Sequence, residues 1–170
     1  MEDLLPDISD AHGDEVMWIP VQWRDFGGKK VFSGRVETLR CYEDNSKVRD
    51  ILGKPGAGRV LVVDGHGNLN KALLGDLLAE RAVENGWEGI VIYGAVRDAG
   101  ALSEMALGVK ALGVCPIKTE KRGLGDEDVQ LRIEGIPVSP GNYLFADLNG
   151  VMISQHPIEF GEPSQTKSEA

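Results

Sequence analysis

The sequence predicts one α/β domain built around a parallel strand–helix–strand (βαβ) unit. Two short runs, residues 59–64 and 89–93, are almost continuously apolar. Such runs are typical of parallel strands that are buried on both faces of a sheet. Between them, apolar residues repeat with the period of a helix over residues 73–83. A strand, a helix and a second strand within roughly 35 residues form a βαβ unit.

The N-terminal part carries weaker signals. Residues 1–15 predict a short amphipathic arm, because their leucines and isoleucine fall at helical spacing. Residues 31–42 predict either one long strand or a pair of strands, whereas residues 18–26 show no clear pattern. A short helix is expected over residues 45–52 and is closed by Gly53.

The central helix is expected to have its first turn near residues 75–78 and to stop at Gly86. The remaining part of the chain predicts a short helix at 102–107 and a strand at 109–117. A strand is expected at 131–138, interrupted by a turn at Glu134-Gly135. Two strands are expected within 143–153, around a turn at Asn149-Gly150.

A length of 170 residues suits a single domain. We expect this domain to span residues 1–160 and to be followed by a flexible polar tail over residues 161–170.

Composition excludes several classes of protein. A net charge of −9 repels phosphate backbones, so direct nucleic-acid binding is not expected; this charge favours solubility or basic protein partners. Cys41 and Cys115 lie in apolar runs without metal-binding spacing, which fits a reducing compartment. The N-terminus lacks the features of a signal peptide, and no apolar run reaches the roughly 18 residues of a membrane helix. We therefore expect a cytoplasmic protein without membrane contact.

The βαβ unit predicts a ligand site. Its two strands are parallel, so the loops that follow them leave the sheet at the same edge, where open α/β sheets bind ligands. The N–H groups of the helix start at 75–78 can hold an anion. After the second strand, Arg97 can grip a carboxylate and Asp98 suits Mg²⁺ or Mn²⁺. Ordinary roles stay open, because Asp76 also favours a helix start and a surface Arg–Asp pair is commonly solvated.

Over residues 7–158 the sequence resembles the RraA-like family, which includes 4-hydroxy-4-methyl-2-oxoglutarate aldolases. The likeness is carried by DISDA at 7–11, by residues 60–65, by WEG at 87–89 and by YGAVRD at 93–98. In the aldolase branch an aspartate is followed by twenty residues and then Arg-Asp. Asp76, followed by Arg97 and Asp98, meets this spacing.

The resemblance implies a swivelling β/β/α domain that assembles as a homotrimer with sites near subunit interfaces. It implies a carbon–carbon lyase, a divalent-metal-dependent class II aldolase that cleaves 4-hydroxy-4-methyl-2-oxoglutarate to pyruvate and decarboxylates oxaloacetate. In the family, the arginine matching Arg97 contacts the substrate and the aspartate matching Asp98 binds the metal, Mg²⁺ or Mn²⁺. The pyruvyl carboxylate is held by backbone groups of a segment that here comprises Gly75, Asp76, Leu77 and Leu78.

The sequence departs from the pattern of the aldolase branch at two places, and both bear on the substrate assignment more than on the metal assignment. The aldolase pattern often has an acidic residue where this chain has Ala101. The better-known aldolases also have a longer C-terminal region, which supplies an acidic group to a neighbouring subunit. Glu159 and Glu162 are the substitutes that this chain offers.

The implied mechanism gives Arg97 and Asp76 catalytic roles. Arg97 adds positive charge where negative charge develops on the pyruvate enolate. Asp76 orders a water that takes the proton from the C4 hydroxyl in the aldol direction. Oxaloacetate needs no such base, because loss of CO₂ yields the same enolate.

Other motifs fail. The loop at 65–70 hints at a dinucleotide fingerprint, but Asn70 stands in place of the third glycine and no acid ends the second strand. The same defects count against a Rossmann-type methyltransferase. His66 lies near the proposed edge, but a lone loop histidine is usually solvated.

A competing class stays open. Another branch of the family regulates ribonuclease activity by binding the enzyme and not the RNA. A net charge of −9 suits docking on basic protein segments. That branch lacks the complete Arg-Asp pair, so the pair at 97–98 favours the enzyme, although the two roles are compatible.

Overall fold

The computed structural model describes residues 3–159, which form four α-helices and twelve β-strands. The helices are α1 (Leu4–His12), α2 (Ser46–Leu52), α3 (Asp76–Glu84) and α4 (Ala99–Ser103). The strands are β1 (Val16–Trp18), β2 (Arg24–Asp25), β3 (Phe32–Arg40), β4 (Arg59–Asp64), β5 (Ala72–Leu74), β6 (Gly89–Val96), β7 (Gly108–Val114), β8 (Asp126–Glu127), β9 (Leu131–Ile133), β10 (Ile136–Val138), β11 (Tyr143–Asp147) and β12 (Gly150–Ser154).

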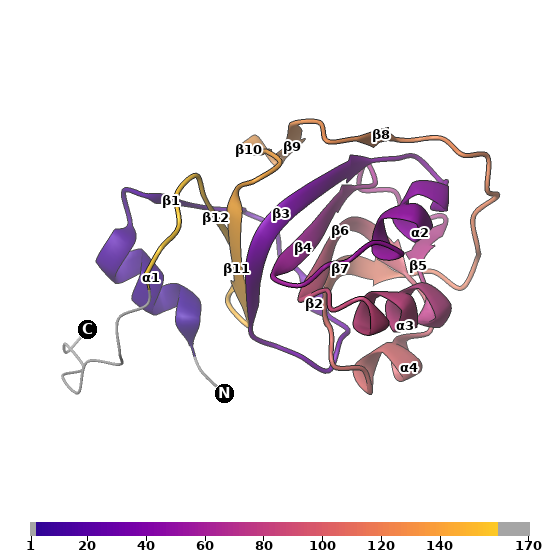
Figure 1. Ribbon diagram of the computed structural model, residues 1–170, viewed down its shortest axis with the longest axis horizontal. Coiled ribbons are helices and arrows are strands. Elements are labelled where there is room, and N and C mark those ends of the chain that lie inside the picture. Colours follow the sequence, from indigo (N-terminus) through magenta and orange to yellow (C-terminus); the bar gives the residue numbers. More distant parts are fainter. Residues whose placement is uncertain (1–2, 160–170) are drawn as a thin grey trace.

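The architecture is a mixed sheet with helices on one face. The strand order is β1-β12-β11-β3-β4-β6-β7-β2, and β3, β4, β6 and β7 run parallel to one another. Figure 1 shows α2, α3 and α4 together on one side of these parallel strands. The predicted α/β class is therefore confirmed.

Two cores stabilise the sheet from opposite faces. The core beneath the helices contains Leu61, Ile90 and Ile92, and the core on the other face contains Val60, Val62 and Val91. The four central residues of β4, at 60–63, thus point alternately to the two cores and are all fully buried. This arrangement explains why the run 59–64 is continuously apolar instead of alternating.

The sheet is rolled so that distant strands meet. Lys110 on β7 is only 1 % exposed, and its Nζ lies 2.9 Å from Asp25 Oδ1 on β2. The same Nζ donates to the carbonyl oxygen of Asp147, at the end of β11. Since β3, β4 and β6 separate β11 from β7 in the sheet, this contact joins its two halves across the second core.

The hairpin β9–β10 covers that second core. It turns at Glu134-Gly135, as predicted, and Glu134 accepts a hydrogen bond from the Tyr93 hydroxyl on β6. This bond, followed by burial, raises the pKa of Tyr93 to about 12, so the phenol stays protonated and keeps the hairpin attached.

The central helix starts within the predicted first turn at 75–78, but two leucines that were counted in its helical repeat belong to a strand. Leu73 and Leu74 belong to strand β5, which pairs in parallel with β6, and α3 begins only at Asp76. Both leucines are buried, so their apolar character fitted a helix and a strand equally well. The end of α3 agrees with the prediction. Gly86 adopts a φ of +81°, its N–H donates to Val83 O, and the N–H of Trp87 donates to Ala82 O.

Other boundaries shift by a few residues. The segment predicted as one strand or two at 31–42 contains the single long strand β3 (Phe32–Arg40), while the expected helix at 102–107 appears earlier, as α4. β6 extends three residues beyond the predicted 89–93, because its last residues pair with β5 and β7. The loop between β11 and β12 consists of Leu148 and Asn149, with Gly150 already in β12.

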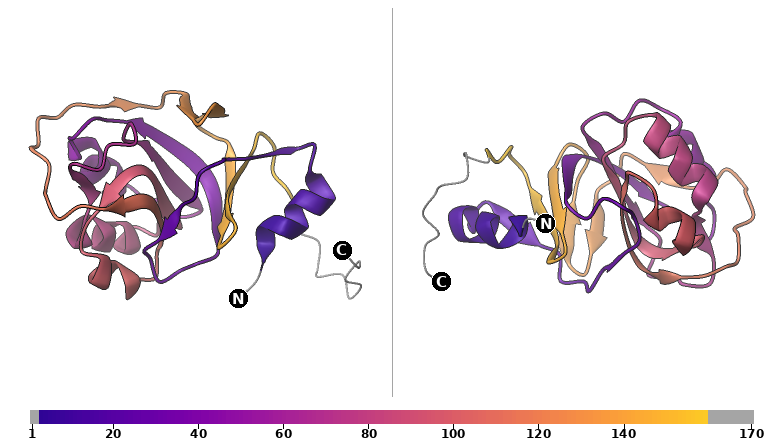
Figure 2. Two further views of the ribbon diagram at one scale, coloured as in Figure 1. Left: turned by 180° about the vertical axis from the view of Figure 1, so that it is seen from behind. Right: turned by 90° about the horizontal axis from the view of Figure 1, so that it is seen from below.

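The N-terminal arm forms a separate unit of structure. Figure 2 shows α1 on the opposite side of the molecule from α2 and α3. Leu5 and Ile8 of α1 pack with Phe145 and Met152 in a small third core. No described helix is long and apolar enough to cross a membrane. The expected tail at 161–170 lies outside the described residues.

Candidate active site at the carboxyl edge of the sheet

The candidate site forms where β5 and β6 end side by side. Ala72 pairs with Ala95 and Leu74 pairs with Val96, and the N–H of Arg97 donates to Leu74 O at 2.8 Å. The chain therefore leaves the sheet twice at one edge, once into α3 and once into α4. The topology brings the helix start near Gly75 beside the Arg97–Asp98 pair.

Asp98 binds directly to the first amide of α3. Its Oδ2 accepts a hydrogen bond from Asp76 N at 2.9 Å. The carboxylate thus lies at the positive end of the α3 dipole, where an anion is favoured. Asp98 itself has left-handed backbone angles, with φ 57° and ψ 43°, while its carbonyl accepts from Leu102 N to start α4. Such backbone conformations are uncommon outside glycine and are often found at functional sites.

Gly75 makes this contact possible. A Cβ atom at this position would lie 2.7 Å from Asp98 Oδ2 and 3.2 Å from Arg97 Nε. The φ of Gly75 is −133°, so any residue could adopt its backbone conformation. The glycine is therefore required by the close approach of two side chains and not by backbone strain.

The anion-binding amides already hold carboxylates of the protein. Asp98 occupies the amide of Asp76, and Asp76 Oδ1 accepts from the amide of Leu77 at 2.8 Å. Among the described residues no partner is found for the amide of Leu78. A substrate carboxylate at this helix start would use the Leu78 amide or replace one of these side-chain contacts.

Arg97 supplies a cation at the same position. Its Nε lies 3.9 Å from Asp98 Oδ2, and the two side chains are 39 % and 37 % exposed. At this distance and exposure the pair is only weakly coupled, so the guanidinium can turn toward a ligand.

The chemistry of these groups fits a hard divalent cation that keeps most of its water. Asp98 offers an exposed carboxylate, of which only Oδ2 is hydrogen-bonded. Within residues 3–159 there is no group of three or more His, Cys, Asp or Glu side chains suited to a metal. Zinc usually takes three or four protein ligands, whereas Mg²⁺ is commonly held by one or two carboxylates with water and substrate oxygens. The residues present therefore fit Mg²⁺ better than Zn²⁺.

Sequence reasoning missed the residues that brace β5. The side chain of Asn45 donates from Nδ2 to Leu73 O at 3.3 Å and accepts from Thr119 Oγ1 and from Lys121 Nζ. These bonds tie the segment after β7 to the strand that leads into Gly75. Asn45 is the first residue of the predicted helix at 45–52, so its sequence position signals only a helix start.

The neighbouring Asp44 fixes the same segment. It accepts from the N–H and hydroxyl of Ser46 and from the N–H groups of Arg122 and Leu124. Burial alone would raise the pKa of this carboxyl, but these hydrogen bonds outweigh burial and lower it to about 2. Asp44 is thus charged at neutral pH and anchors this segment.

Two other features lie apart from these groups. The backbone N–H of His66 donates to Asp64 at the end of β4, and the His66 ring lies 5.7 Å from the ring of Tyr42, which follows β3. An open hollow of about 410 Å³ contains none of the predicted site residues; it is lined by Ser33, Gly34, Arg35, Gly58, Tyr143, Leu144, Phe145, Pro157 and Ile158.

The glycine-containing loop after β4 does not form a dinucleotide site. A nucleotide-binding loop of that type passes from a strand directly into a helix, whose N-terminus holds the pyrophosphate. Here the loop passes from β4 into strand β5. The rejection of the dinucleotide fingerprint thus has a structural reason.

Fold and site together define a small α/β protein whose sheet edge combines a helix start, an arginine and an exposed carboxylate. The chain belongs to the RraA-like family, described as Aldolase/RraA, whose model matches residues 5–153. The resemblance noted in the sequence is therefore confirmed.

Curated relatives agree with this family. A protein of Photobacterium profundum, provisionally named a 4-hydroxy-4-methyl-2-oxoglutarate aldolase, is 54 % identical over 159 residues, which cover 94 % of this chain and 98 % of that protein. A protein of Vibrio vulnificus with the same provisional name is 52 % identical over 160 residues, covering 94 % of this chain and all of that protein.

Solved structures agree with the fold but carry different names. The RNA-processing inhibitor RraA from Thermus thermophilis is 44 % identical with a TM-score of 0.89, and the match covers 98 % of this chain and 99 % of that one. A protein from Geobacillus kaustophilus HTA426, described as an S-adenosylmethionine:2-dimethylmenaquinone methyltransferase, is 39 % identical with a TM-score of 0.90, covering 95 % and 100 %.

Proposed function

We propose that this protein is a divalent-metal-dependent carbon–carbon lyase that cleaves 4-hydroxy-4-methyl-2-oxoglutarate into two molecules of pyruvate and also decarboxylates oxaloacetate. One observation carries the proposal: Asp98, Arg97 and the first amides of α3 meet at one edge of the sheet. The provisional names of relatives about 50 % identical support the aldolase substrate.

In this proposal each group has one role. Asp98 would hold the divalent metal, which would supply Lewis-acid chemistry to the 2-oxo acid. Arg97 orients the 2-oxo acid and stabilises the same developing charge. Backbone amides of the segment 75–78 hold the pyruvyl carboxylate, either through the amide of Leu78 or by replacing a side-chain contact of the other two α3 amides. Asp76 orders a water that removes the proton of the C4 hydroxyl; the C3–C4 bond then breaks, and its electron pair stays on C3 as pyruvate enolate.

Decarboxylation of oxaloacetate needs fewer of these groups than aldol cleavage does. Loss of CO₂ leaves its electron pair on C3 and gives the same enolate, so no base is needed. We therefore expect Asp76→Asn to lose more aldolase activity than decarboxylase activity.

The deciding experiment measures release of pyruvate from both substrates with Mg²⁺, with EDTA, and in Asp98→Asn. Asparagine can still accept from the Asp76 amide and tolerates the left-handed backbone, but it lacks the charge that holds a cation. Asp128→Asn is the matched control, because Asp128 is exposed and also has a positive φ of 54°. Pyruvate release that persists both with EDTA and in Asp98→Asn would refute the proposed dependence on a metal.

Arg97→Ala should reduce kcat/KM by ~10²–10³, the usual cost of removing one group that stabilises an oxyanion. Steady-state kinetics with oxaloacetate measures this loss. Activity within a few-fold of the unchanged protein would remove Arg97 from the mechanism.

We further propose a homotrimer with its sites at subunit interfaces. Leu69, Val114 and Ile117 are each about half exposed, and Val114 ends the strand that runs beside β6 toward the site. Such a group of aliphatic side chains is commonly covered by a second subunit. Light scattering coupled to size-exclusion chromatography would decide, and a monomer at assay concentration would contradict the proposal.

A second function has one specific observation in its favour, the 44 % identity to the RNA-processing inhibitor from Thermus thermophilis. The chain would then bind a ribonuclease directly. A pull-down with purified ribonuclease, repeated with Asp98→Asn, tests this role separately from catalysis, because ribonuclease binding that persists in this variant does not depend on the proposed metal site.

The methyltransferase name of the Geobacillus kaustophilus structure finds no support in the glycine loop, since β5 follows it in place of a helix.

A further inference from the structure

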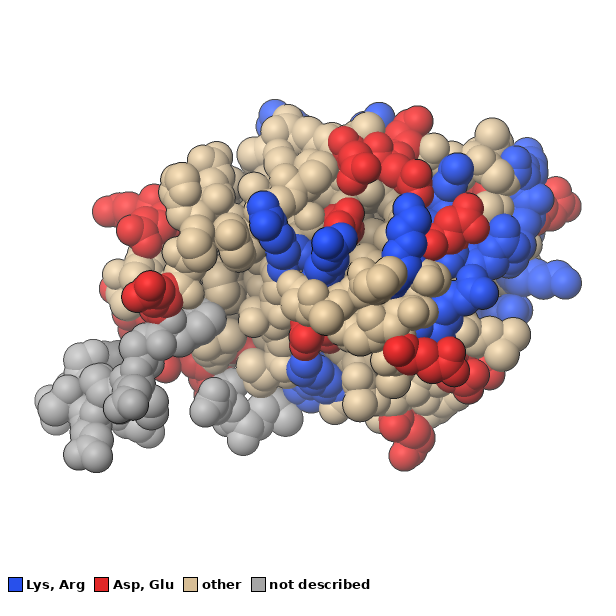
Figure 3. Space-filling view, viewed as in Figure 1, with Lys and Arg blue, Asp and Glu red and all other residues tan. Residues whose placement is uncertain are grey.

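The open hollow of about 410 Å³ lies over β3 and β11, between α1 and the helices on the other side of the molecule (Figure 1). Its floor consists of residues 33–35 of β3 and residues 143–145 of β11, which pair with each other in the sheet. One wall consists of Pro157 and Ile158, which follow β12. Figure 3 shows basic side chains over β3 and β4 in the middle of this face. The hollow is thus a feature of the sheet face that the helices leave uncovered.

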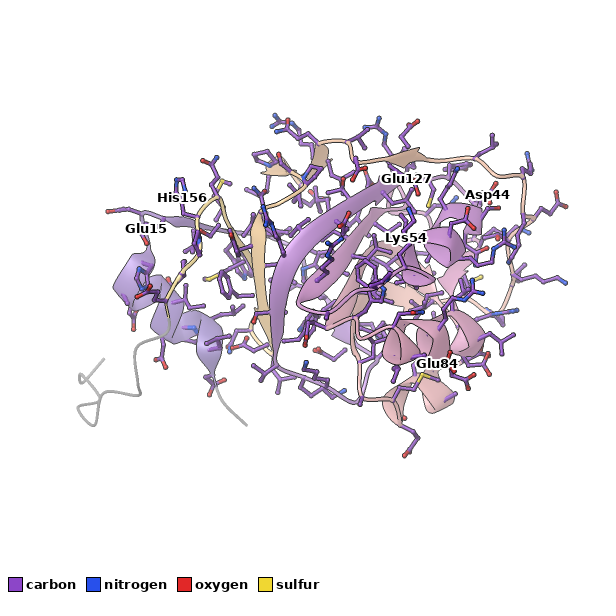
Figure 4. All side chains as sticks on the ribbon, viewed as in Figure 1. Glu15, Asp44, Lys54, Glu84, Glu127 and His156 are labelled. Atoms are coloured by element: carbon purple, nitrogen blue, oxygen red, sulfur yellow. The ribbon has the colours of Figure 1, made fainter. Side chains whose placement is uncertain are left out.

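The hollow lies at the opposite edge of the sheet from the candidate active site. Residues 33–35 belong to the start of β3, and Gly58 comes just before β4, so both lie at the amino edge of the parallel strands. The candidate active site follows the carboxyl ends of β5 and β6. Figure 4 labels His156, which precedes the wall of the hollow, and Lys54, which follows α2, on the two sides of β11 and β3. A ligand in the hollow would therefore not contact the candidate active site.

Arg35 brings a positive charge without a counterion to the hollow. Its side chain is exposed, and within residues 3–159 it forms no ion pair with an acid. Glu37, two residues further along β3, is bound by Arg59 at 2.6 Å. None of the residues that line the hollow is acidic, and Glu159, which follows the wall, is exposed. A guanidinium in this situation is suited to bind a carboxylate through two parallel hydrogen bonds.

Neighbouring groups orient Arg35 and add hydrogen-bond donors. The guanidinium carbon lies 5.9 Å from the centroid of the Tyr143 ring, a distance at which the ring face attracts a cation. Ser33 lies on the same side of β3 as Arg35, because side chains two residues apart share a face. Within the described chain the hydroxyls of Ser33 and Tyr143 have no hydrogen-bond partner, and both residues are partly exposed. Both hydroxyls are thus available to a carboxylate bound at Arg35.

The wall of the hollow is apolar and offers nothing to a second charge. Ile158 is 8 % exposed and belongs to the third core, and Pro157 beside it is exposed. A second carboxylate against this wall would lose hydration without gaining a partner. The volume falls within the roughly 300–1,000 Å³ that is usual for small-molecule sites. We propose that the hollow is a second ligand site, which binds a small monocarboxylic acid with an apolar body independently of the candidate active site.

Benzoate is the probe, because it carries one carboxylate on an apolar ring. Calorimetry with EDTA present should give a dissociation constant on the order of 1 mM, as expected for a ligand of so few atoms. Acetate, which lacks the ring, and benzyl alcohol, which lacks the charge, should each bind at least about tenfold more weakly. In NMR spectra of the amides, benzoate should shift the signals of Gly34 and Gly58 and leave the signal of Gly75 in place.

Variants at single arginines test which cation holds the carboxylate. Arg35→Gln should weaken benzoate binding by about tenfold or more, because a charge-assisted contact is lost. Arg35→Lys keeps the charge without the planar fork, so its affinity should fall between the two. Arg132→Gln is the matched control, since Arg132 is an exposed arginine of β9 outside the hollow. Arg97→Ala, at the other edge of the sheet, should also bind benzoate as the unchanged protein does.

The alternatives give different results. Loss of benzoate binding in Arg97→Ala, or shifts at Gly75 in place of Gly34 and Gly58, would assign benzoate to the candidate active site and overturn the proposal. Equal affinities of Arg35→Gln and Arg132→Gln, or no binding of benzoate at all, would do the same. An affinity that falls as the protein concentration rises would mean that a second copy of the chain covers the hollow, which also contradicts the proposal. Pyruvate release is not measured here, so the outcome is independent of the proposed lyase activity.

Discussion

The space between Gly75 and Asp98 is too small for a methyl group, which gives the candidate site a test at a single residue. In Gly75→Ala the new Cβ would lie 2.7 Å from Asp98 Oδ2. The end of a short side chain can move away at little cost in stability, but a displacement of about 1 Å can cost ~10² in rate. We expect kcat/KM to fall by about that factor while the thermal midpoint changes little. Gly100→Ala is the control, since a Cβ there meets no atom within 4 Å.

Asp44 gives a prediction about pH. Its folded-state pKa of about 2 lies below the ordinary 3.8, so its contribution to stability is complete above about pH 4 and is lost as the pH falls through 2. We expect Asp44→Asn to lower the free energy of unfolding by about 2 kcal/mol at pH 7. Urea titrations at several pH values would show the difference between the two proteins shrinking between pH 4 and 2. A constant difference over that range would contradict the assignment.

At the scale of elements, the sequence predicted the long buried segments well. The run 59–64 coincides with β4, and Gly86 ends α3 as expected, because full burial and a left-handed C-terminal glycine leave few alternatives. β1, β2 and β8 were not predicted; each is two or three residues long and too short to show a period. Leu73 and Leu74 were assigned to a helix because β5 is defined by its pairing with β6, which local pattern cannot show.

The candidate site was predictable in its position more than in its contacts. Parallel strands brought Asp98 to the α3 start, as the crossover rule required. Two contacts depend on side-chain packing between segments that are distant in sequence. Asp98 accepts a hydrogen bond from the Asp76 amide, and Asn45 donates one to Leu73 O of β5. No spacing rule encodes such contacts.

Helix α1 depends on a residue far away in the sequence. Its own N-cap residue, Asp3, makes no side-chain capping bond, and instead the fully buried Asp147 accepts from Leu5 N at 2.8 Å and from Asn149 N at 2.6 Å. Asp147→Ala removes this cap and leaves a buried N–H unpaired, so we expect a loss of about 2 kcal/mol. Hydrogen exchange should accelerate in α1 and remain slow in β4.

A matched variant separates capping from charge. Asp7→Ala removes an acid that belongs to the first turn of α1 itself. Because Asp7 is exposed, the free energy of unfolding should fall by only a few tenths of a kcal/mol. Equal exchange rates in the two variants would argue against capping by Asp147.

At the scale of the whole molecule, one buried cation contacts both halves of the rolled sheet. Lys110 joins β7 to β2 through Asp25 and reaches the Asp147 carbonyl on β11. Removing one partner of a buried ion pair typically costs about 3–5 kcal/mol, because the remaining charge has no counterion. Asp25 is 18 % exposed, so Lys110→Met should fall near the lower end of that range.

The double variant Lys110→Met/Asp25→Asn tests whether charge or shape closes the sheet. If the charge pair matters mainly by mutual compensation, the double variant should be more stable than Lys110→Met, because no uncompensated charge is left buried. If the bond of Lys110 to the Asp147 carbonyl dominates, the double variant should be no more stable than the single one, since both lack that donor. Urea unfolding of the four proteins in this cycle measures the coupling energy. A coupling near zero would mean that the second core, and not the ion pair, holds the two halves of the sheet together.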